Sequence, residues 1–140
     1  MRLWHEKLIP LLPRQQLLGQ HRECCALRGA GWGKPHATVN YVFDHPMLWL
    51  YCYHFKVMEE MTRRGYKPEI DWYYPYYRGK QLPIKLECVD LDEIIKKLQH
   101  TVYPEHDDRY MAECINNLAT KGIYIEYSEN PLPLEEFEDE

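Results

Sequence analysis

The sequence predicts an all-α protein, a single compact domain of three main helices with irregular, aromatic-rich connections. Two observations carry this prediction: apolar residues recur at helical spacing in three long segments, and no alternating segment has a good partner with which to form a sheet. The length of 140 residues and the apolar content of 45% fit one hydrophobic core. We expect residues 1–130 to form the domain and the acidic residues 131–140 to form a flexible tail.

The first helix is expected over residues 13–28, between a proline and a glycine. Its inward face is made of Leu17, Leu18, His21, Cys24 and Cys25. At about 100° per residue, Glu23 points away from that face and is flanked by Gly19 and Ala26. A glycine inside a helix costs about 1 kcal/mol relative to alanine. We therefore expect this open face to be approached closely by another molecule.

A second helix is expected over residues 45–64, capped by Asp44 and ended by Gly65. Residues 66–89 contain three prolines and the aromatic run 72–77, and we expect an ordered connection there. The aromatic run is interpreted as packing on the helices, with stacking on nucleic-acid bases as the alternative.

The last part of the chain is expected to contain two helices. Asp90 is predicted to cap a short helix that reaches Leu98, and a longer helix is expected after Pro104 with its end at Gly122. Residues 123–127 alternate as a strand does, but the sequence offers no good partner strand.

Charge is distributed unevenly along the chain. The net charge is −5, which on its own argues against a nucleic-acid partner, yet residues 1–36 contain six Lys/Arg and only two acidic residues. Five of the last six residues are acidic. The basic head is therefore the part of the chain that we expect to meet an anionic partner.

The cysteines and the N-terminal residues indicate the compartment in which we expect the protein. The five cysteines lack a CxxC spacing, so we expect reduced thiols rather than disulfides or a structural zinc site. His21 with Cys24 or Cys25 has a spacing that a metal could use, but we interpret these residues as core thiols beside a histidine and expect no metal and no cofactor. With no signal peptide and no membrane span in the sequence, a cytoplasmic location is expected.

Two short motifs resemble a known family. Met1-Arg2, followed by Leu17-Leu18-x-x-x-Arg22-Glu23 on the first helix, resembles the pyrimidine-dimer DNA glycosylase family, the phage endonuclease V type. Members have an amino-terminal residue followed by Arg, and an Arg-Glu pair about twenty residues further on. Looser correspondences extend the resemblance over residues 1–122.

The resemblance implies a bifunctional DNA glycosylase and AP lyase. By this analogy the α-amine of Met1 is the nucleophile and Glu23 is the essential acid/base, while Arg2 and Arg22 hold phosphates that flank the lesion. The implied partner is double-stranded DNA with a damaged or abasic nucleotide, pyrimidine dimers by resemblance. A monomer that does not bind membranes is expected.

Two further DNA-binding residues also come from the resemblance. A second arginine on the family's first helix corresponds to Ala26 here, and Arg28 is the nearest substitute. His36 matches a family position and is expected to approach the phosphodiester.

Two alternatives remain open at this stage. A non-catalytic helical adaptor would bind a protein partner through the aromatic run and the acidic tail, and would not need its N-terminus. An AP lyase or glycosylase for a different lesion would keep the amine chemistry and change the substrate, because pocket shape and stacking select the base.

Overall fold

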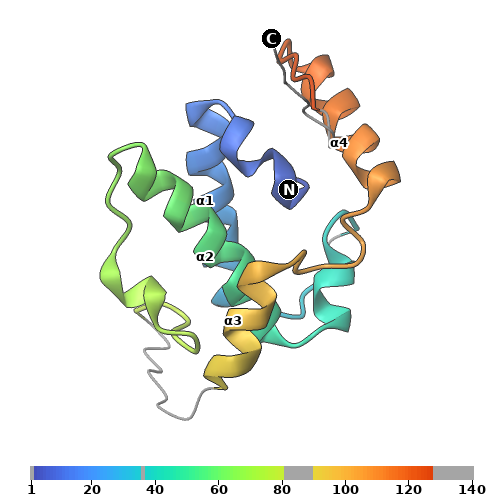
Figure 1. Cartoon of the computed structure of the whole chain (residues 1–140). Coiled ribbons are helices and arrows are strands. Elements are labelled where there is room, and N and C mark those ends of the chain that lie inside the picture. Colours follow the sequence, from blue (N-terminus) through green and yellow to red (C-terminus); the bar gives the residue numbers. More distant parts are fainter. Residues whose placement is uncertain (1, 36, 81–89, 128–140) are drawn as a thin grey trace, which may run out of the picture.

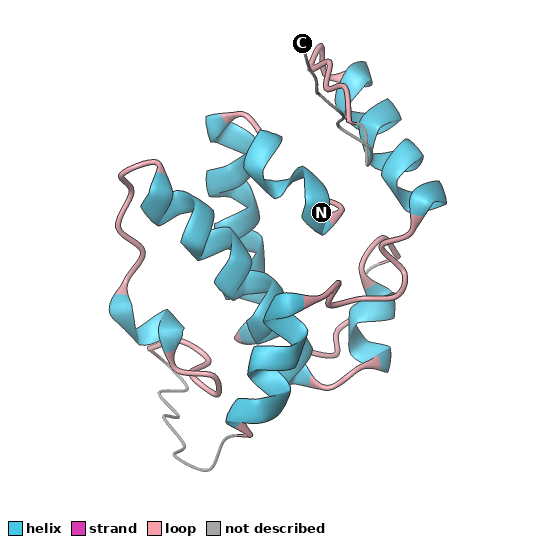
Figure 2. Ribbon diagram, in the orientation of Figure 1, coloured by secondary structure: helices cyan, strands magenta, loops and turns pink. Residues whose placement is uncertain are grey.

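Helices dominate the described part of the chain, which comprises residues 2–35, 37–80 and 90–127 of a computed structural model. The α-helices are α1 (Arg14–Arg28), α2 (Met47–Arg63), α3 (Leu91–Gln99) and α4 (Asp108–Thr120), and the short 3-10 helices are η1 (Glu6–Leu11), η2 (Asn40–Asp44) and η3 (Ile70–Tyr73). Figures 1 and 2 show no strand among these residues. The predicted all-α class is confirmed.

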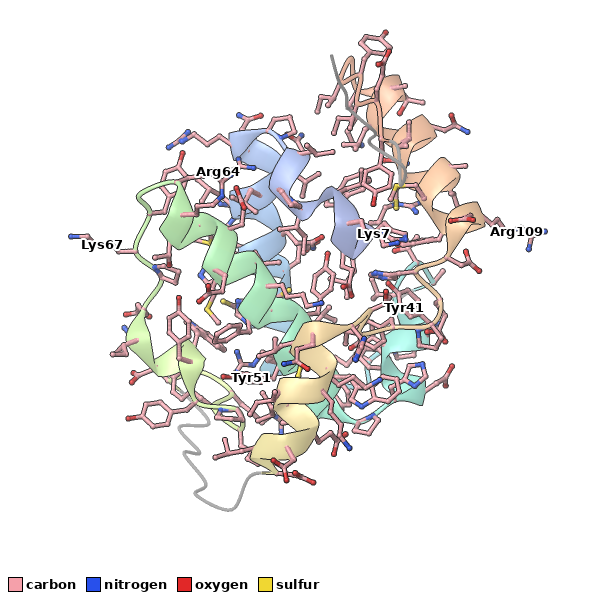
Figure 3. All side chains as sticks on the ribbon, in the orientation of Figure 1. Lys7, Tyr41, Tyr51, Arg64, Lys67 and Arg109 are labelled. Carbon is pink, nitrogen blue, oxygen red and sulfur yellow. The ribbon has the colours of Figure 1, made fainter. Side chains whose placement is uncertain are left out.

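The core lies between α1 and α2, with α3 and η1 packed on α2. Its fully buried side chains include Leu17 and Cys24 from α1 and Leu50, Tyr53 and Val57 from α2. Charged side chains such as Lys67 and Arg109 project from opposite sides of the molecule, whereas Tyr51 on α2 is buried (Figure 3). Within the described ranges, no helix combines the length and the apolar character needed to cross a membrane.

The N-terminal segment, residues 2–5, lies between α1 and α4 (Figure 1). Leu3 is fully buried, and the Tyr110 hydroxyl of α4 donates a hydrogen bond of 2.5 Å to the Leu3 carbonyl. Buried side chains of α4 belong to the same core, namely Met111, Cys114 and Leu118. Helix α4 is therefore held against the body partly through the start of the chain.

The start of α2 differs from the prediction. Asp44 does not cap this helix; it is the last residue of η2, and Pro46 occupies the cap position with a φ of −60°. His45 has extended backbone angles of −125° and 162°, because a residue that precedes proline avoids the helical region. By contrast, the predicted cap of α3 is confirmed, since the Asp90 side chain accepts the N–H of Glu93 at 3.0 Å.

The aromatic run and the alternating segment both pack without forming strands. Tyr77 is 2% exposed, and the Trp72 ring lies 5.8 Å from that of His54, so this part of the connection packs against α2. Residues 123–127 alternate between partly buried and exposed side chains but form no ladder with another described residue. The predicted tail, residues 131–140, lies outside the described residues.

Candidate active site

A cleft of about 540 Å³ lies where α1, the N-terminal segment and the end of α4 meet. It is lined by Arg2, Trp4, Gln16, Gly19, Gln20, Arg22, Glu23, Thr38, Asn117 and Lys121. Three of the predicted site residues therefore share one cleft, Arg2, Arg22 and Glu23, together with Gly19. A larger hollow, about 690 Å³ beside η1, α2 and α3, contains none of the predicted site residues that the structure describes.

Gly19 and Glu23 form the open face of the cleft on α1. Glu23 is half-buried and Arg22 is exposed. A Cβ atom built on Gly19 would meet only the Arg22 Nη2 atom, at 3.6 Å, which is an ordinary contact distance. The packing of the protein therefore does not require a glycine at this position, and its helix cost of about 1 kcal/mol is consistent with a molecule that approaches from outside.

Arg2 reaches the cleft from the N-terminal segment. Its guanidinium lies 5.9 Å from the centre of the Trp4 ring and 5.8 Å from that of Tyr110, so both rings support the cation. Arg2 Nη1 also lies 3.5 Å from a carboxylate oxygen of Glu113, which is 64% exposed. The Arg2 side chain is only 19% exposed, so solvent screens this ion pair mainly on the Glu113 side.

Hydrogen bonds fix the backbone of the N-terminal segment on α1 and α2. The Gln20 side chain accepts the N–H of Trp4 at 2.7 Å and donates to the carbonyl of Arg2 at 3.0 Å. The Tyr53 hydroxyl lies 2.6 Å from the Trp4 carbonyl oxygen and 2.9 Å from Gln20 Oε1. Arg2 is therefore held at the cleft by its backbone as well as by its side chain.

Arg28 does not lie at the cleft, and the prediction that it contacts DNA does not fit its position. Its side chain is fully buried, and Nη1 donates to His54 Nδ1 at 2.9 Å and to the Trp72 carbonyl at 2.8 Å. Nη2 donates to the carbonyls of Tyr74 and Tyr77 at 2.7 and 3.0 Å. A buried guanidinium that makes these four hydrogen bonds cannot reach a phosphate. We therefore assign Arg28 the role of fixing the aromatic run 72–77 on α1.

Met1 and His36, the remaining predicted site residues, lie outside the described residues. Met1 is covalently bonded to Arg2, which lines the cleft.

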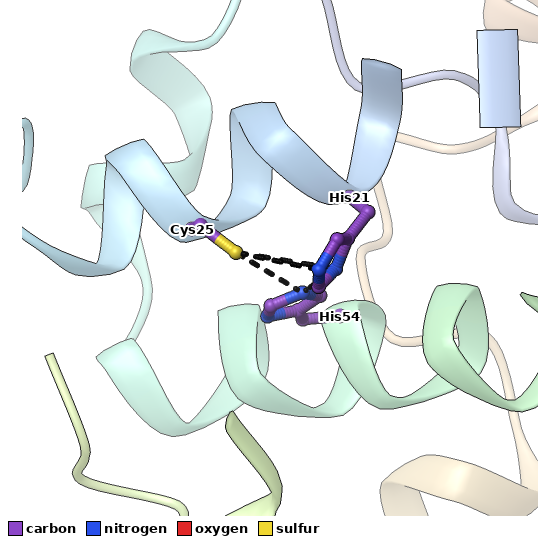
Figure 4. Close-up of side chains that lie close together, drawn as sticks. All are labelled: His21, Cys25 and His54. Atoms are coloured by element: carbon purple, nitrogen blue, oxygen red, sulfur yellow. Dashed lines mark hydrogen bonds between the residues drawn. The ribbon is translucent and has the colours of Figure 1, made fainter. Parts of the chain in front are cut away.

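His21, Cys25 and His54 lie close enough together to be considered as a metal site (Figure 4). Because Arg28 only donates, His54 Nδ1 must accept, and His54 Nε2 then carries the proton and donates to His21 Nδ1 at 2.8 Å. Burial first, and then the charge of Arg28, hold the pKa of His54 well below its usual value. Burial also raises the pKa of Cys25 to about 12. These hydrogen bonds and the nearby positive charge favour a neutral polar cluster over a bound cation.

Gln20 and Lys121 are among the cleft residues that the sequence analysis missed. Gln20 follows Leu17 by three residues and precedes Cys24 by four, so its place on the buried face was detectable as a polar residue among apolar ones. Lys121 follows the last residue of α4. Its proximity to α1 depends on how two segments separated by about a hundred residues pack together, and no local pattern encodes that.

Comparison with known proteins identifies the family. A family model described as pyrimidine dimer DNA glycosylase matches residues 1–74, which include α1, η2, α2 and two of the described cationic residues of the cleft. No curated protein and no solved structure matches the chain. Since the matched region is more than half of the 140 residues, the chain belongs to the pyrimidine dimer DNA glycosylase family.

Proposed function

We propose that this chain is a DNA glycosylase with AP lyase activity that uses the α-amine of Met1 as its nucleophile and Glu23 as its acid/base. The observation that carries the proposal is the cleft, which gathers Glu23, Arg22 and the open face at Gly19 around Arg2, the residue bonded to Met1. The substrate proposed is double-stranded DNA that contains a damaged nucleotide, pyrimidine dimers in accordance with the family, or an abasic site.

The α-amine suits this chemistry because of its acidity. Its usual pKa is about 7.7 to 8, so a useful fraction is neutral at pH 7, whereas a lysine amine near 10.4 is almost fully protonated. The neutral nitrogen attacks C1′ of the damaged nucleotide, the N-glycosidic bond breaks, and the base leaves with the bonding electrons and takes up a proton. The nitrogen then loses a proton, and its lone pair forms the C1′=N bond as the C1′–O4′ bond breaks and O4′ takes up a proton. The enzyme and the opened sugar are then joined as a protonated imine.

Glu23 is proposed to move the protons of the reaction. As an acid it assists opening of the sugar ring, and as a base it removes a proton from C2′ of the imine. The C2′–H electrons then form the C1′–C2′ enamine that expels the 3′ phosphate by cleavage of the C3′–O bond. The half-buried position of Glu23 beside the start of the chain supports this assignment.

The cations of the cleft are proposed to hold the DNA backbone. Arg2 and Arg22 flank Glu23 and would bind phosphates on either side of the lesion, and Lys121 adds a third positive charge from the end of α4. Extrusion of a nucleotide, which glycosylases require, would then place C1′ over the open face at Gly19.

Borohydride trapping on an abasic-site duplex tests the proposal. The amine nitrogen adds to the C1′ aldehyde, water leaves, and hydride reduces the imine to a stable secondary amine that joins protein to DNA. We expect protein whose intact mass shows a free Met1 amine to be trapped, and protein acetylated at the α-amine to give no adduct. Glu23→Gln should retain DNA binding and lose about 10²-fold in strand cleavage. Glu59→Gln, an exposed glutamate of α2 away from the cleft, is the matched control.

The outcomes separate the alternatives. Trapping that survives acetylation would overturn Met1 as the nucleophile, and Lys121→Arg would then test the only other amine that the described cleft contains. A complete lack of trapping and cleavage by the unblocked protein would favour the non-catalytic adaptor. A panel of duplexes with pyrimidine dimers or other base lesions identifies the excised base.

A further inference from the structure

We infer that Gln20 is a positioning residue that sets the place of the Met1 amine relative to Glu23, an inference that rests on the proposed function. Gln20 is 2% exposed, and its side-chain amide holds the N–H of Trp4 and the carbonyl of Arg2. These two backbone groups belong to alternate residues of a segment that is not helical. The amide therefore pairs with the segment as a neighbouring β-strand would.

The cost of burying an amide distinguishes this role from ordinary packing of the core. Burial of a side-chain amide costs free energy unless its polar atoms are hydrogen-bonded. Leu17 and Leu27 on the same helix show that α1 fills its buried face with leucine where only packing is needed. At position 20 the helix instead has a glutamine, whose amide makes hydrogen bonds to the backbone of Arg2 and Trp4 near the start of the described chain.

The spacing on α1 links this anchor to the proposed acid/base. Gln20 and Glu23 are three residues apart, so their Cβ atoms are neighbours on the helix surface, about 5 to 6 Å apart. Both side chains line the cleft, as does Arg2. Gln20 holds the carbonyl of Arg2, and Arg2 is joined to Met1 by a peptide bond. Gln20, which anchors the segment that carries the nucleophile, therefore lies within one turn of α1 from Glu23, the proposed acid/base.

Two variants at position 20 separate position from stability. Gln20→Met keeps the length of the side chain and removes both hydrogen bonds to the segment. Gln20→Glu keeps an acceptor for the Trp4 N–H and for the Tyr53 hydroxyl, and at pH 8.5 it turns an ionised carboxylate toward the Arg2 carbonyl in place of the amide donor. Gln15→Met, an exposed glutamine of α1 outside the cleft, is the matched control.

Single-turnover borohydride trapping at saturating abasic-site duplex is measured alongside the Kd for the same duplex in the absence of borohydride. We expect Gln20→Met, and Gln20→Glu at pH 8.5, to slow trapping by about 10- to 100-fold, because a displacement of about 1 Å has such an effect on a reacting group. The Kd should rise by a smaller factor than the factor by which trapping slows, because Arg2 is the one cation carried by the released segment while Arg22 and Lys121 remain in place. Gln15→Met should match the parent in both measurements.

A second measurement tests whether the remaining site is intact. Methylamine added to Gln20→Met supplies a diffusible amine that can act in place of the displaced Met1 amine. We expect it to restore Glu23-dependent cleavage above the level seen in the Gln20→Met/Glu23→Gln double variant. Parent-like trapping by both position-20 variants would overturn the inference, as would loss of trapping and binding in equal proportion. Failure of the parent to trap would instead refute the proposed function, so the two failures are distinguishable.

Discussion

Gly19 gives the most direct test of the open face on α1, because stability and activity should change in opposite directions. A Cβ atom at this position meets only Arg22 Nη2, at 3.6 Å, so alanine fits without displacing its neighbours. Alanine is favoured over glycine inside a helix by about 1 kcal/mol. We expect Gly19→Ala to raise the free energy of unfolding by about 0.5 to 1 kcal/mol, which raises the Tm by about 2 to 5 °C for a chain of this length.

Gly19→Leu keeps most of this helix gain but places a branched side chain in the cleft beside Glu23. If the DNA backbone approaches this face, displacement of the substrate by about 1 Å is enough to lower turnover by about 10²-fold. Thermal unfolding followed by circular dichroism gives the stability, and borohydride trapping with abasic-site duplex gives the activity. Ala112→Leu, at an exposed position of α4 outside the cleft, controls for the added apolar bulk.

Two results would refute the reasoning about Gly19. A lower Tm for Gly19→Ala would mean that the fold itself requires the glycine. Parent-like trapping by Gly19→Leu would mean that no substrate approaches the face beside Glu23.

Three further predictions concern binding, packing and pH. Arg22→Gln should reduce the slope of log K against log salt by about 1, as loss of one phosphate contact does, and an unchanged slope would remove Arg22 from the DNA-binding surface. Arg28→Met should lower the free energy of unfolding in urea by about 3 kcal/mol, because buried carbonyls lose their donors, and should leave the salt slope unchanged. His106 should make the protein less stable as the pH falls below about 6.5: burial lowers its pKa to about 3 in the folded state, so between pH 6.5 and 3 the unfolded state binds more protons. At pH 5 this one group removes about 2 kcal/mol, and His106→Gln should show a shallower loss in urea titrations at pH 7 and 5.

The positions of the helices were predictable because their signals are local. The period of α1 and the cap of α3 depend on residues within one or two turns of each other, and the structure contains both. The start of α2 was missed by two residues because Pro46 was not considered as the cap itself. The cleft was predictable in part, since Arg22 and Glu23 lie on one outward arc of α1 that the helical period defines.

The parts of the site that the sequence did not show depend on contacts between distant residues. The Gln20 amide holds backbone sixteen and eighteen residues earlier in the chain, and the Tyr110 hydroxyl holds the carbonyl of Leu3 across 107 residues. No periodicity encodes such pairs. A polar side chain at a buried position indicates that it has a hydrogen-bond partner. The helical period places Gln20 on the buried face of α1, but the sequence does not show which residues are its partners.

Arg28 shows how helical geometry can correct a family resemblance at a single residue. The resemblance selected Arg28 as a substitute for an arginine at the position of Ala26, which is exposed. Eleven residues separate Leu17 from Arg28, a rotation that returns to within about 20° of the Leu17 direction. The period that makes Leu17 a core residue therefore makes Arg28 one too, whereas Arg22 lies about 140° away and is exposed. A substitute two residues along a helix is turned by about 200°, so Arg28 cannot occupy the helix face on which Ala26 lies. The third cation that lines the cleft is instead Lys121, the residue that follows α4.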